Sequence, residues 1–287
     1  MYNNGIQKKF EGDTKMKKLL TLVLALILVL GCFSAALADN LSDIQEKGTL
    51  VVGANVLFPP YEFYYTNPET GEEEYAGFDM ALAKGVADLL GVELVIADQD
   101  FAGLVTALSV GELDMVISGI AIRDDRKEVV DFSDPYYNGT QIMMVRAEDF
   151  DTLKAVEDLS GKNVGAQTGS LQAGILEEQF ADSNAFLNDK IPLMVLDLMN
   201  GDLDGLLLTD TVAKQYMAVY PDKFVISDVP VVYDNTAGVG IAVQKGDNET
   251  LLALLNDYIA QIKADGTFDA WEQEAMTKSA NLVETAD

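Results

Sequence analysis

Apolar and polar residues alternate along most of the chain with two periods, one typical of buried strands and one typical of amphipathic helices. Residues 50–54 form an apolar run that predicts a buried strand. Residues 78–90 have helical spacing, and Gly91 ends the pattern. The predicted apolar face of this helix consists of Phe78, Leu82, Val86 and Leu89. A second strand is predicted at 93–97.

The strand and helix rhythm continues and then restarts in the second half of the chain. A helix is predicted at 102–110, before Gly111, and a strand at 114–118. The restarted series comprises a strand at 163–166, helices at 171–180 and 192–200, a strand at 205–208, and a helix after Thr209-Asp210. This βαβ order predicts mostly parallel sheets flanked by helices.

Two short segments recur in the same order in each half. Val52-Gly53-Ala54-Asn55 matches Val164-Gly165-Ala166-Gln167, and the segment 108–114 matches 198–204. Repetition in register favours a two-lobed α/β protein. Ligands of such sheets bind beyond the carboxyl ends of the strands, so the residues that follow each repeated segment are candidates for a cleft.

The first 38 residues are typical of a signal peptide. Lys17-Lys18 precede the apolar run 19–30, which is short for a membrane span, and Met16 is a plausible start. Two processing signals remain open: a lipoprotein box ending at Cys32, and a small-residue site ending at Ala38. The short distance from Cys32 to the first folded segment favours cleavage after Ala38. Either signal predicts an exported protein.

Composition excludes several kinds of chemistry. Cys32 is the only cysteine and the chain has no histidine, so we expect no disulfide, no cysteine nucleophile, no histidine base and no bound metal or cofactor. Removing residues 1–38 takes away five lysines and two acidic residues, which changes the net charge from −28 to −31. Nucleic acids and anionic membranes are therefore poor partners, and the charge serves mainly solvation.

An ordered set of motifs carries a family resemblance across residues 41–280. The set comprises Phe58-Pro59-Pro60-Tyr61-Glu62-Phe63, the segments 77–83, 100–108, 118–127, 131–137 and 164–170, Asp210, and the segment 263–268. With these motifs the chain resembles the type II periplasmic binding proteins for polar amino acids, the bacterial extracellular solute-binding proteins of family 3. The resemblance implies a two-lobed fold in which two hinge strands join mostly parallel sheets flanked by helices.

The same resemblance implies the lobe limits. Lobe 1 is expected to comprise 41–144 plus 236–284, and lobe 2 the segment 145–235. The hinge strands are expected near Met144-Val145 and Asn235-Thr236.

A free amino acid carries two charges, and each needs a partner when it leaves water. The resemblance assigns the ligand carboxylate to Arg126, whose planar guanidinium can bind it with two hydrogen bonds, and the ligand ammonium to Asp210. The alternatives are a surface ion pair for Arg126 with Asp124, Asp125 or Glu128, and a helix-capping role for Asp210.

The resemblance implies further ligand contacts in both lobes. Phe58 and Phe101 are expected to cover the ligand side chain, although Phe101 could instead belong to the core. The remaining expected contacts are the backbone N–H groups around Gly119, Ala121 and Ser170, the carbonyl of Ser118, the side chains of Gln167 and Thr168, and, as additional candidates, Asn55 and Gln172.

Three positions depart from the family pattern. Ala121 stands where Ser or Thr is usual, Arg123 replaces a Thr that commonly caps the next helix, and Asn55 holds a position that is often acidic in binders of cationic amino acids. Asn55 argues against a cationic ligand, and the lack of a second cation near the site argues against an acidic one. A neutral polar amino acid is therefore favoured.

The expected role is capture of an amino acid for the permease of an ABC importer, by a monomer that closes around its ligand and catalyses nothing. Two alternatives remain. A secreted dehydratase on the same scaffold could use Glu62 or Asp210 as an acid, and a sensory module could present the ligand to a receptor.

Overall fold

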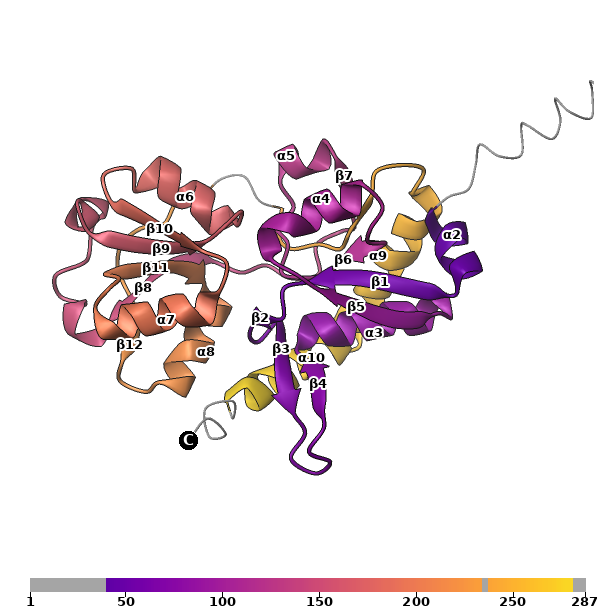
Figure 1. Cartoon of the computed structure of the whole chain (residues 1–287), viewed down its shortest axis with the longest axis horizontal. Coiled ribbons are helices and arrows are strands. Elements are labelled where there is room, and N and C mark those ends of the chain that lie inside the picture. The colour runs from indigo at the N-terminus through magenta and orange to yellow at the C-terminus, as the bar shows by residue number, and fades with distance from the viewer. Residues whose placement is uncertain (1–39, 234–236, 281–287) are drawn as a thin grey trace, which may run out of the picture. The chain divides into compact units, whose positions relative to one another are not determined.

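The computed structural model describes residues 40–233 and 237–280, which contain two five-stranded sheets and one three-stranded sheet (Figure 1). The predicted signal peptide, both processing sites and Cys32 lie outside these residues. No helix in the two described ranges is long and apolar enough to cross a membrane.

The first five-stranded sheet has the strand order β5-β1-β6-β13-β7. Its strands are β1 (Thr49–Ala54), β5 (Glu93–Asp98), β6 (Met115–Val116), β7 (Val130–Phe132) and β13 (Ala242–Gln244). β1 is parallel to β5 and β6, whereas β13 is antiparallel to β6 and β7. The three-stranded sheet consists of β2 (Leu57–Phe58), β3 (Glu62–Thr66) and β4 (Glu73–Ala76).

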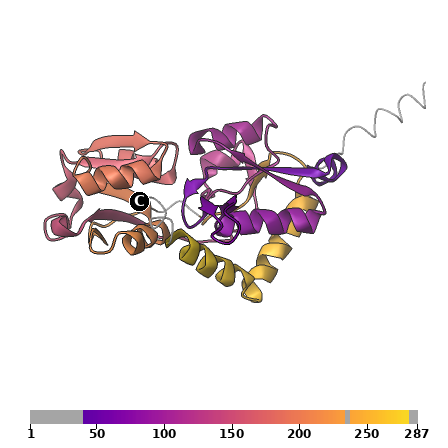
Figure 2. The same cartoon turned by 60° about the horizontal axis from the view of Figure 1, so that its bottom comes forward.

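Helices from both ends of the described chain accompany the first sheet. They are α2 (Asn40–Lys47), α3 (Phe78–Leu90), α4 (Leu104–Ser109) with a 3₁₀ turn at Phe101–Gly103, α5 (Asp124–Lys127), α9 (Glu249–Ala264) and α10 (Thr267–Ala280). α3 and α4 contact β1, and α10 contacts α3. Figure 2 shows α9 and α10, in yellow, following each other at an angle.

The second five-stranded sheet has the strand order β10-β9-β11-β8-β12. Its strands are β8 (Gln141–Arg146), β9 (Asn163–Gln167), β10 (Asn184–Asn188), β11 (Gly205–Thr209) and β12 (Phe224–Ile226). Its helices are α6 (Leu171–Gln179), α7 (Ile191–Asn200) and α8 (Asp210–Val219), with 3₁₀ turns at Ala147–Asp149 and Val156–Leu159. β9 is parallel to β10 and β11, whereas β8 is antiparallel to β11 and β12.

The two sheets have the same connectivity. In each sheet, the first strand of the βα series (β1 or β9) lies between the second (β5 or β10) and the third (β6 or β11). The strand that the chain forms after it crosses from the other sheet (β13 or β8) lies between the third and the fourth (β7 or β12). That inserted strand, β13 in the first sheet and β8 in the second, runs opposite to the other four. The prediction of two similar, mostly parallel modules is confirmed.

Two aspartates of the repeated segments occupy equivalent positions. Oδ2 of Asp114 accepts a hydrogen bond from the backbone N–H of Val51 at 2.7 Å, and the Asp114 N–H donates to the Val51 carbonyl. Asp204 makes the same pair of bonds with Asn163, at 2.9 and 2.8 Å. Asp114 therefore holds the start of β6 beside β1, and Asp204 holds the start of β11 beside β9.

Two glycines of the repeated segments make room for equivalent leucines. A Cβ atom on Gly53 would collide with the side chain of Leu113, and one on Gly165 would lie 2.8 Å from Leu203 Cδ1. Because any larger side chain would displace these buried leucines, the two glycines have the same packing role in the two halves.

The predicted helix at 78–90 is confirmed, but one of its predicted core residues is wrong. Leu89 is 39% exposed, whereas Leu90 is 5% exposed. The buried stripe also includes Ala83 and Ala87, so its centre lies on the Leu90 side. The strand predicted at 114–118 is shorter than expected, because only Met115–Val116 pair with neighbours as a strand.

The chain passes between the two sheets twice, through residues 133–140 and through a second segment between Ile226 and Ala242, of which 227–233 and 237–241 are described. Met144 and Val145 lie inside β8, which pairs with β11 and β12 of the second sheet. Asn235 and Thr236 lie outside the described residues. The lobe limits and hinge positions expected from the resemblance stay predictions.

Candidate functional site

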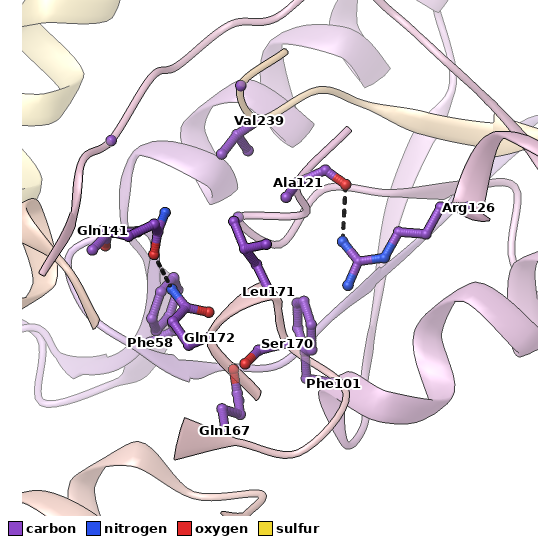
Figure 3. Close-up of a pocket in the computed structure, with 14 residues that line it drawn as sticks. Phe58, Phe101, Ala121, Arg126, Gln141, Gln167, Ser170, Leu171, Gln172 and Val239 are labelled. Carbon is purple, nitrogen blue, oxygen red and sulfur yellow. Dashed lines mark hydrogen bonds between the residues drawn. The ribbon is translucent and has the colours of Figure 1, made fainter. Parts of the chain in front are cut away.

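A cavity of about 510 Å³, part of which opens to solvent, lies where the carboxyl ends of several strands meet the crossing segments (Figure 3). It is lined by Phe58, Phe101, Gly119, Ala121, Arg126, Gly139, Gln141, Gln167, Ser170, Leu171, Gln172, Thr209, Gly238 and Val239. Eight of these are residues that the sequence assigns to the ligand site. Among the described residues that line the cavity, Arg126 has the one charged side chain.

Arg126 is buried at 7% exposure and has no carboxylate partner within 4.0 Å among the described residues. Its Nη1 donates to the carbonyl of Ala121 at 2.9 Å (Figure 3). Its Nη2 donates to the carbonyl of Gly169 at 3.1 Å. Asp125, a proposed alternative partner, instead forms two hydrogen bonds with Arg123. The buried guanidinium therefore lacks a counter-charge.

Burial and the nearby Arg123 lower the pKa of Arg126 to about 10. Arg126 therefore remains positively charged at neutral pH. An isolated buried charge of this kind is costly unless a ligand or water neutralises it. An anionic group bound in the cavity would supply that compensation.

Two aromatic rings form walls of the cavity. The guanidinium carbon of Arg126 lies 5.6 Å from the ring centre of Phe101, a distance that allows a cation–π interaction. Phe58 stacks on Tyr61 with ring centres 4.8 Å apart. Gly119, at φ 56°, faces Phe58, because a Cβ there would lie 2.9 Å from Phe58 Cε1. Glycine thus permits both the backbone turn and the ring's position.

The N-terminus of α6 also faces the cavity. Ser170 caps this nine-residue helix, because its Oγ accepts a hydrogen bond from the Ala173 N–H at 3.1 Å. Leu171 and Gln172, the first two helical residues, line the cavity. Their N–H groups lie in the first turn, where backbone N–H groups lack carbonyl partners within the helix and the helix dipole favours an anion. Arg126 and this helix end together suit a carboxylate.

Amide side chains occupy another part of the cavity. Gln172 Nε2 donates to Gln141 Oε1 at 2.8 Å (Figure 3). Gln167 Nε2 donates to Asn55 Oδ1 at 3.1 Å and to the carbonyl of Asp189. Neutral amides can donate and accept hydrogen bonds, so this region suits a polar uncharged group.

Arg123 and Arg126, in the segment that follows β6, also contact residues that follow β9. Besides the bond between Arg126 and Gly169, Nη1 of Arg123 lies 3.5 Å from the carbonyl of Ser170. Gly169 has φ 71°, and a Cβ there would lie 3.0 Å from the backbone of Ala102. These contacts place the two sides of the cavity next to each other.

Ser118 and Gly119 are already engaged by buried groups. Ser118 Oγ donates to Glu62 Oε1 at 2.5 Å, and the Gly119 N–H donates to Asp79 Oδ2 at 2.6 Å. The Gly119 N–H is therefore not the free donor that the sequence analysis expects. The backbone N–H of Ala121, in contrast, has no acceptor among the described residues.

Asp210 and Thr168 do not line the cavity. Asp210 is the first residue of α8; its Oδ1 accepts from the Thr140 N–H at 3.0 Å, and its Oδ2 lies 2.6 Å from Lys214 Nζ. The N-cap of α8 is Thr209, so the capping alternative for Asp210 is wrong in detail. The Thr168 N–H donates to the Asn188 carbonyl. Their ligand roles stay predictions.

The sequence analysis missed Leu171 and the lining residues that precede or belong to the crossing segments. The missed residues are Gly139, Gln141, Leu171, Thr209, Gly238 and Val239. Leu171 could have been found, because it follows the N-cap serine of a predicted helix. Thr209 could also have been found, because it directly follows a predicted strand, whereas the others required knowledge of where the chain crosses between the sheets.

Residues 50–278 match the family model of the bacterial extracellular solute-binding proteins, family 3. The chain belongs to this family. It is 31% identical over 262 residues to ABC transporter arginine-binding protein 1 of Escherichia coli (strain K12), covering 89% of this chain and 99% of that protein. It is 30% identical over 255 residues to an L-cystine-binding protein of the same strain, covering 88% and 92%.

A solved structure supports the fold. The chain resembles an amino acid ABC transporter substrate-binding protein from Streptococcus pneumoniae bound to L-arginine, with a TM-score of 0.78 and 31% identity over 83% of this chain and 98% of that one. The expected two-lobed type II fold is thereby confirmed. These relatives are named as binding proteins, which favours binding over the dehydratase alternative.

Proposed function

We propose that the protein captures a polar L-amino acid outside the cytoplasm and delivers it to the permease of an ABC importer. The observation that carries this proposal is Arg126, a buried cation that faces the cavity beside the N-terminus of α6 and has no ion-pair partner among the described residues. The α-carboxylate of an amino acid supplies the missing anion. The reported relatives, whose names include arginine and L-cystine binding, support this ligand class.

The ligand favoured by the lining residues has an uncharged polar side chain. The described lining residues offer amides from Gln167, the partner of Asn55, and from the Gln141–Gln172 pair, but no acidic side chain to match a cationic ligand. Phe58 and Phe101 cover apolar parts of the ligand side chain. L-glutamine is therefore expected to bind more tightly than L-arginine.

Ligand binding is completed by closure of the two lobes. Phe58, Phe101 and Arg126 hold the ligand from the first lobe, with the Ser118 carbonyl facing its ammonium. Gln167, Thr168, Ser170 and Asp210 add contacts from the second lobe, and the closed form is recognised by the permease. Binding without turnover and a monomeric state follow from this scheme. Cleavage after Ala38 releases the mature chain, whereas lipidation of Cys32 would anchor it.

The test is isothermal titration calorimetry of the purified chain with L-glutamine, L-arginine and L-cystine. Arg126→Ala is expected to raise Kd more than about tenfold, because a charge-assisted hydrogen bond contributes roughly 1.5–3 kcal/mol. Arg126→Lys keeps the charge but loses the planar pair of donors, so its Kd should lie between that of the unmodified chain and that of Arg126→Ala.

Lys127→Ala is the matched control, because Lys127 lies on the same helix but is exposed and paired with Asp124. Its Kd should equal that of the unmodified chain. Equal affinities in Arg126→Ala and Lys127→Ala would contradict the assignment. Failure to bind any of the three amino acids would contradict the proposed ligand class.

A further inference from the structure

Two carboxyl side chains lie fully buried behind the cavity wall. Glu62, on β3, and Asp79, on α3, are both 0% exposed. Each holds one residue of the segment that follows β6: Glu62 accepts from Ser118 Oγ at 2.5 Å, and Asp79 accepts from the Gly119 N–H at 2.6 Å. Gly119 itself lines the cavity. The two acids therefore contact the ligand site from its buried side.

One further hydrogen bond of this cluster supports an anion at Asp79. Asp79 Oδ2 also accepts from the Tyr136 hydroxyl at 2.8 Å. The second oxygens, Glu62 Oε2 and Asp79 Oδ1, have no hydrogen-bond partner among the described residues, and each carboxyl group is near enough to the other to affect its pKa. A neutral Glu62 that donates to an ionised Asp79 satisfies both orphaned oxygens.

The electrostatics require at least one proton on this pair. Burial, and then the nearby Asp79, raise the pKa of Glu62 well above its usual value. Burial raises the pKa of Asp79 as well, although its hydrogen bonds with Gly119 and Tyr136 oppose the rise. The other groups that act on the pair are Asp98 and the phenols of Tyr61 and Tyr136, none of which is a cation.

We propose that Glu62 and Asp79 are positioning residues of the ligand site, which share one proton and thereby fix Ser118 and Gly119 at the cavity wall. This inference rests on the proposed function. When the proton is lost, two adjacent buried carboxylates repel each other, and the bonds that hold Ser118 and Gly119 are strained. Phe58 packs directly on Gly119, so its ring moves with that segment.

The proton shared by Glu62 and Asp79 predicts that ligand affinity falls at alkaline pH. A ligand that needs the protonated arrangement has an apparent Kd that rises in proportion as the fraction of that arrangement falls. Glu62→Gln mimics the protonated acid, because its amide oxygen can accept from Ser118 and its amide nitrogen can donate to Asp79. The affinity of this variant for L-glutamine should therefore vary less with pH than that of the unmodified chain, without the decline at alkaline pH.

Two measurements test the proposal. The first is calorimetric titration of L-glutamine, and in parallel of L-arginine and L-cystine, at several pH values from about 6 to 9 for the unmodified chain, Glu62→Gln and Asp79→Asn. In the Asp79→Asn variant the amide can likewise donate to Glu62, so its profile should also flatten. Profiles in both variants that parallel that of the unmodified chain would overturn the proposal.

The second measurement needs no ligand and only the unmodified chain. The amide proton of Gly119 donates to Asp79, so its NMR shift should follow the titration of the pair, and the Ser118 amide should change with it. A Gly119 amide insensitive to pH over this range would overturn the shared proton, whether or not the variants fold. A chain that binds none of the three amino acids at any pH, but shows the Gly119 titration, would overturn the proposed function and leave the proton sharing intact.

Discussion

Gln167 donates a hydrogen bond from Nε2 to Oδ1 of Asn55 at 3.1 Å. The two residues hold the same place in the repeated segments, at or just beyond the carboxyl ends of β9 and β1, which are equivalent strands of the two sheets. The bond therefore joins equivalent positions of the two repeated segments. It also connects Gln167, which lines the cavity, to Asn55, which is not among the lining residues.

Replacing Asn55 by Asp should change ligand preference. A carboxylate next to the cavity attracts a cationic side chain, while Gln167 can still donate to it. We expect L-arginine to gain affinity relative to L-glutamine by about tenfold, a difference of about 1.4 kcal/mol. Calorimetry with both amino acids checks this, with Asn67→Asp in an exposed turn as the control. An unchanged ratio would contradict a role for this position in ligand choice.

Gly119→Ala should weaken ligand binding more than the same replacement at another glycine with positive φ. Gly119 and Gly91 both have positive φ, but a Cβ on Gly119 meets Phe58 and Tyr61, whereas a Cβ on Gly91 meets open space. Both variants lose about 1 kcal/mol of stability through backbone strain, and only Gly119→Ala also displaces Phe58. Urea denaturation and amino-acid titration should show weakened binding in Gly119→Ala alone. Equal effects on affinity would refute the contact.

Asp210→Asn should weaken binding with little effect on stability. Asp210 is 24% exposed and its ion pair with Lys214 is near the surface, so the pair contributes about 0–1 kcal/mol. If Asp210 binds the ligand ammonium on closure, Kd rises about tenfold or more, because an amide replaces a charge. Lys214→Ala, which removes the same ion pair, should leave Kd nearly unchanged. Similar affinities in both variants would assign Asp210 a purely structural role.

Stability should decrease as pH rises through the range set by the buried acids. The pKa of Asp79 is raised from 3.8 to about 7, and that of Glu62 is also raised, so between these values the native chain holds protons that the unfolded chain has lost. Unfolding then releases protons, and raising the pH favours it. Urea midpoints at pH 5 and about pH 7.5 should differ in this direction, and Asp79→Asn should reduce the difference.

Sequence periodicity predicts most of the βα series of both halves, because these elements are local and bounded by glycines, but it misses β10, most of whose residues are exposed. It does not predict β8, β12 and β13, whose partners are distant in sequence; β13, for example, pairs with β6 and β7. Periodicity wrongly places Leu89 in the core, because the buried face of the helix at 78–90 is wider than a single line of apolar residues.

The candidate site was predictable to the extent that motifs mark it. Arg126, Phe58 and Phe101 line one cavity, as the resemblance implies. The contributions of Gly139 and Val239 come from the crossing segments, which have no periodic pattern. The pairing of Glu62 with Asp79 was also hidden, because the two acids are 17 positions apart in the sequence and meet only through the packing of β3 and α3.

The placement of β13 sets an order for assembly of the newly made chain. β13 lies between β6 and β7, so the first sheet stays incomplete until residues 242–244 are available. The second sheet is built from a single uninterrupted stretch, 141–226, and can close earlier as the chain emerges. The half of the molecule that begins first is thus the later of the two to be finished, and Arg126 reaches its final surroundings only after residues 242–244 have been made.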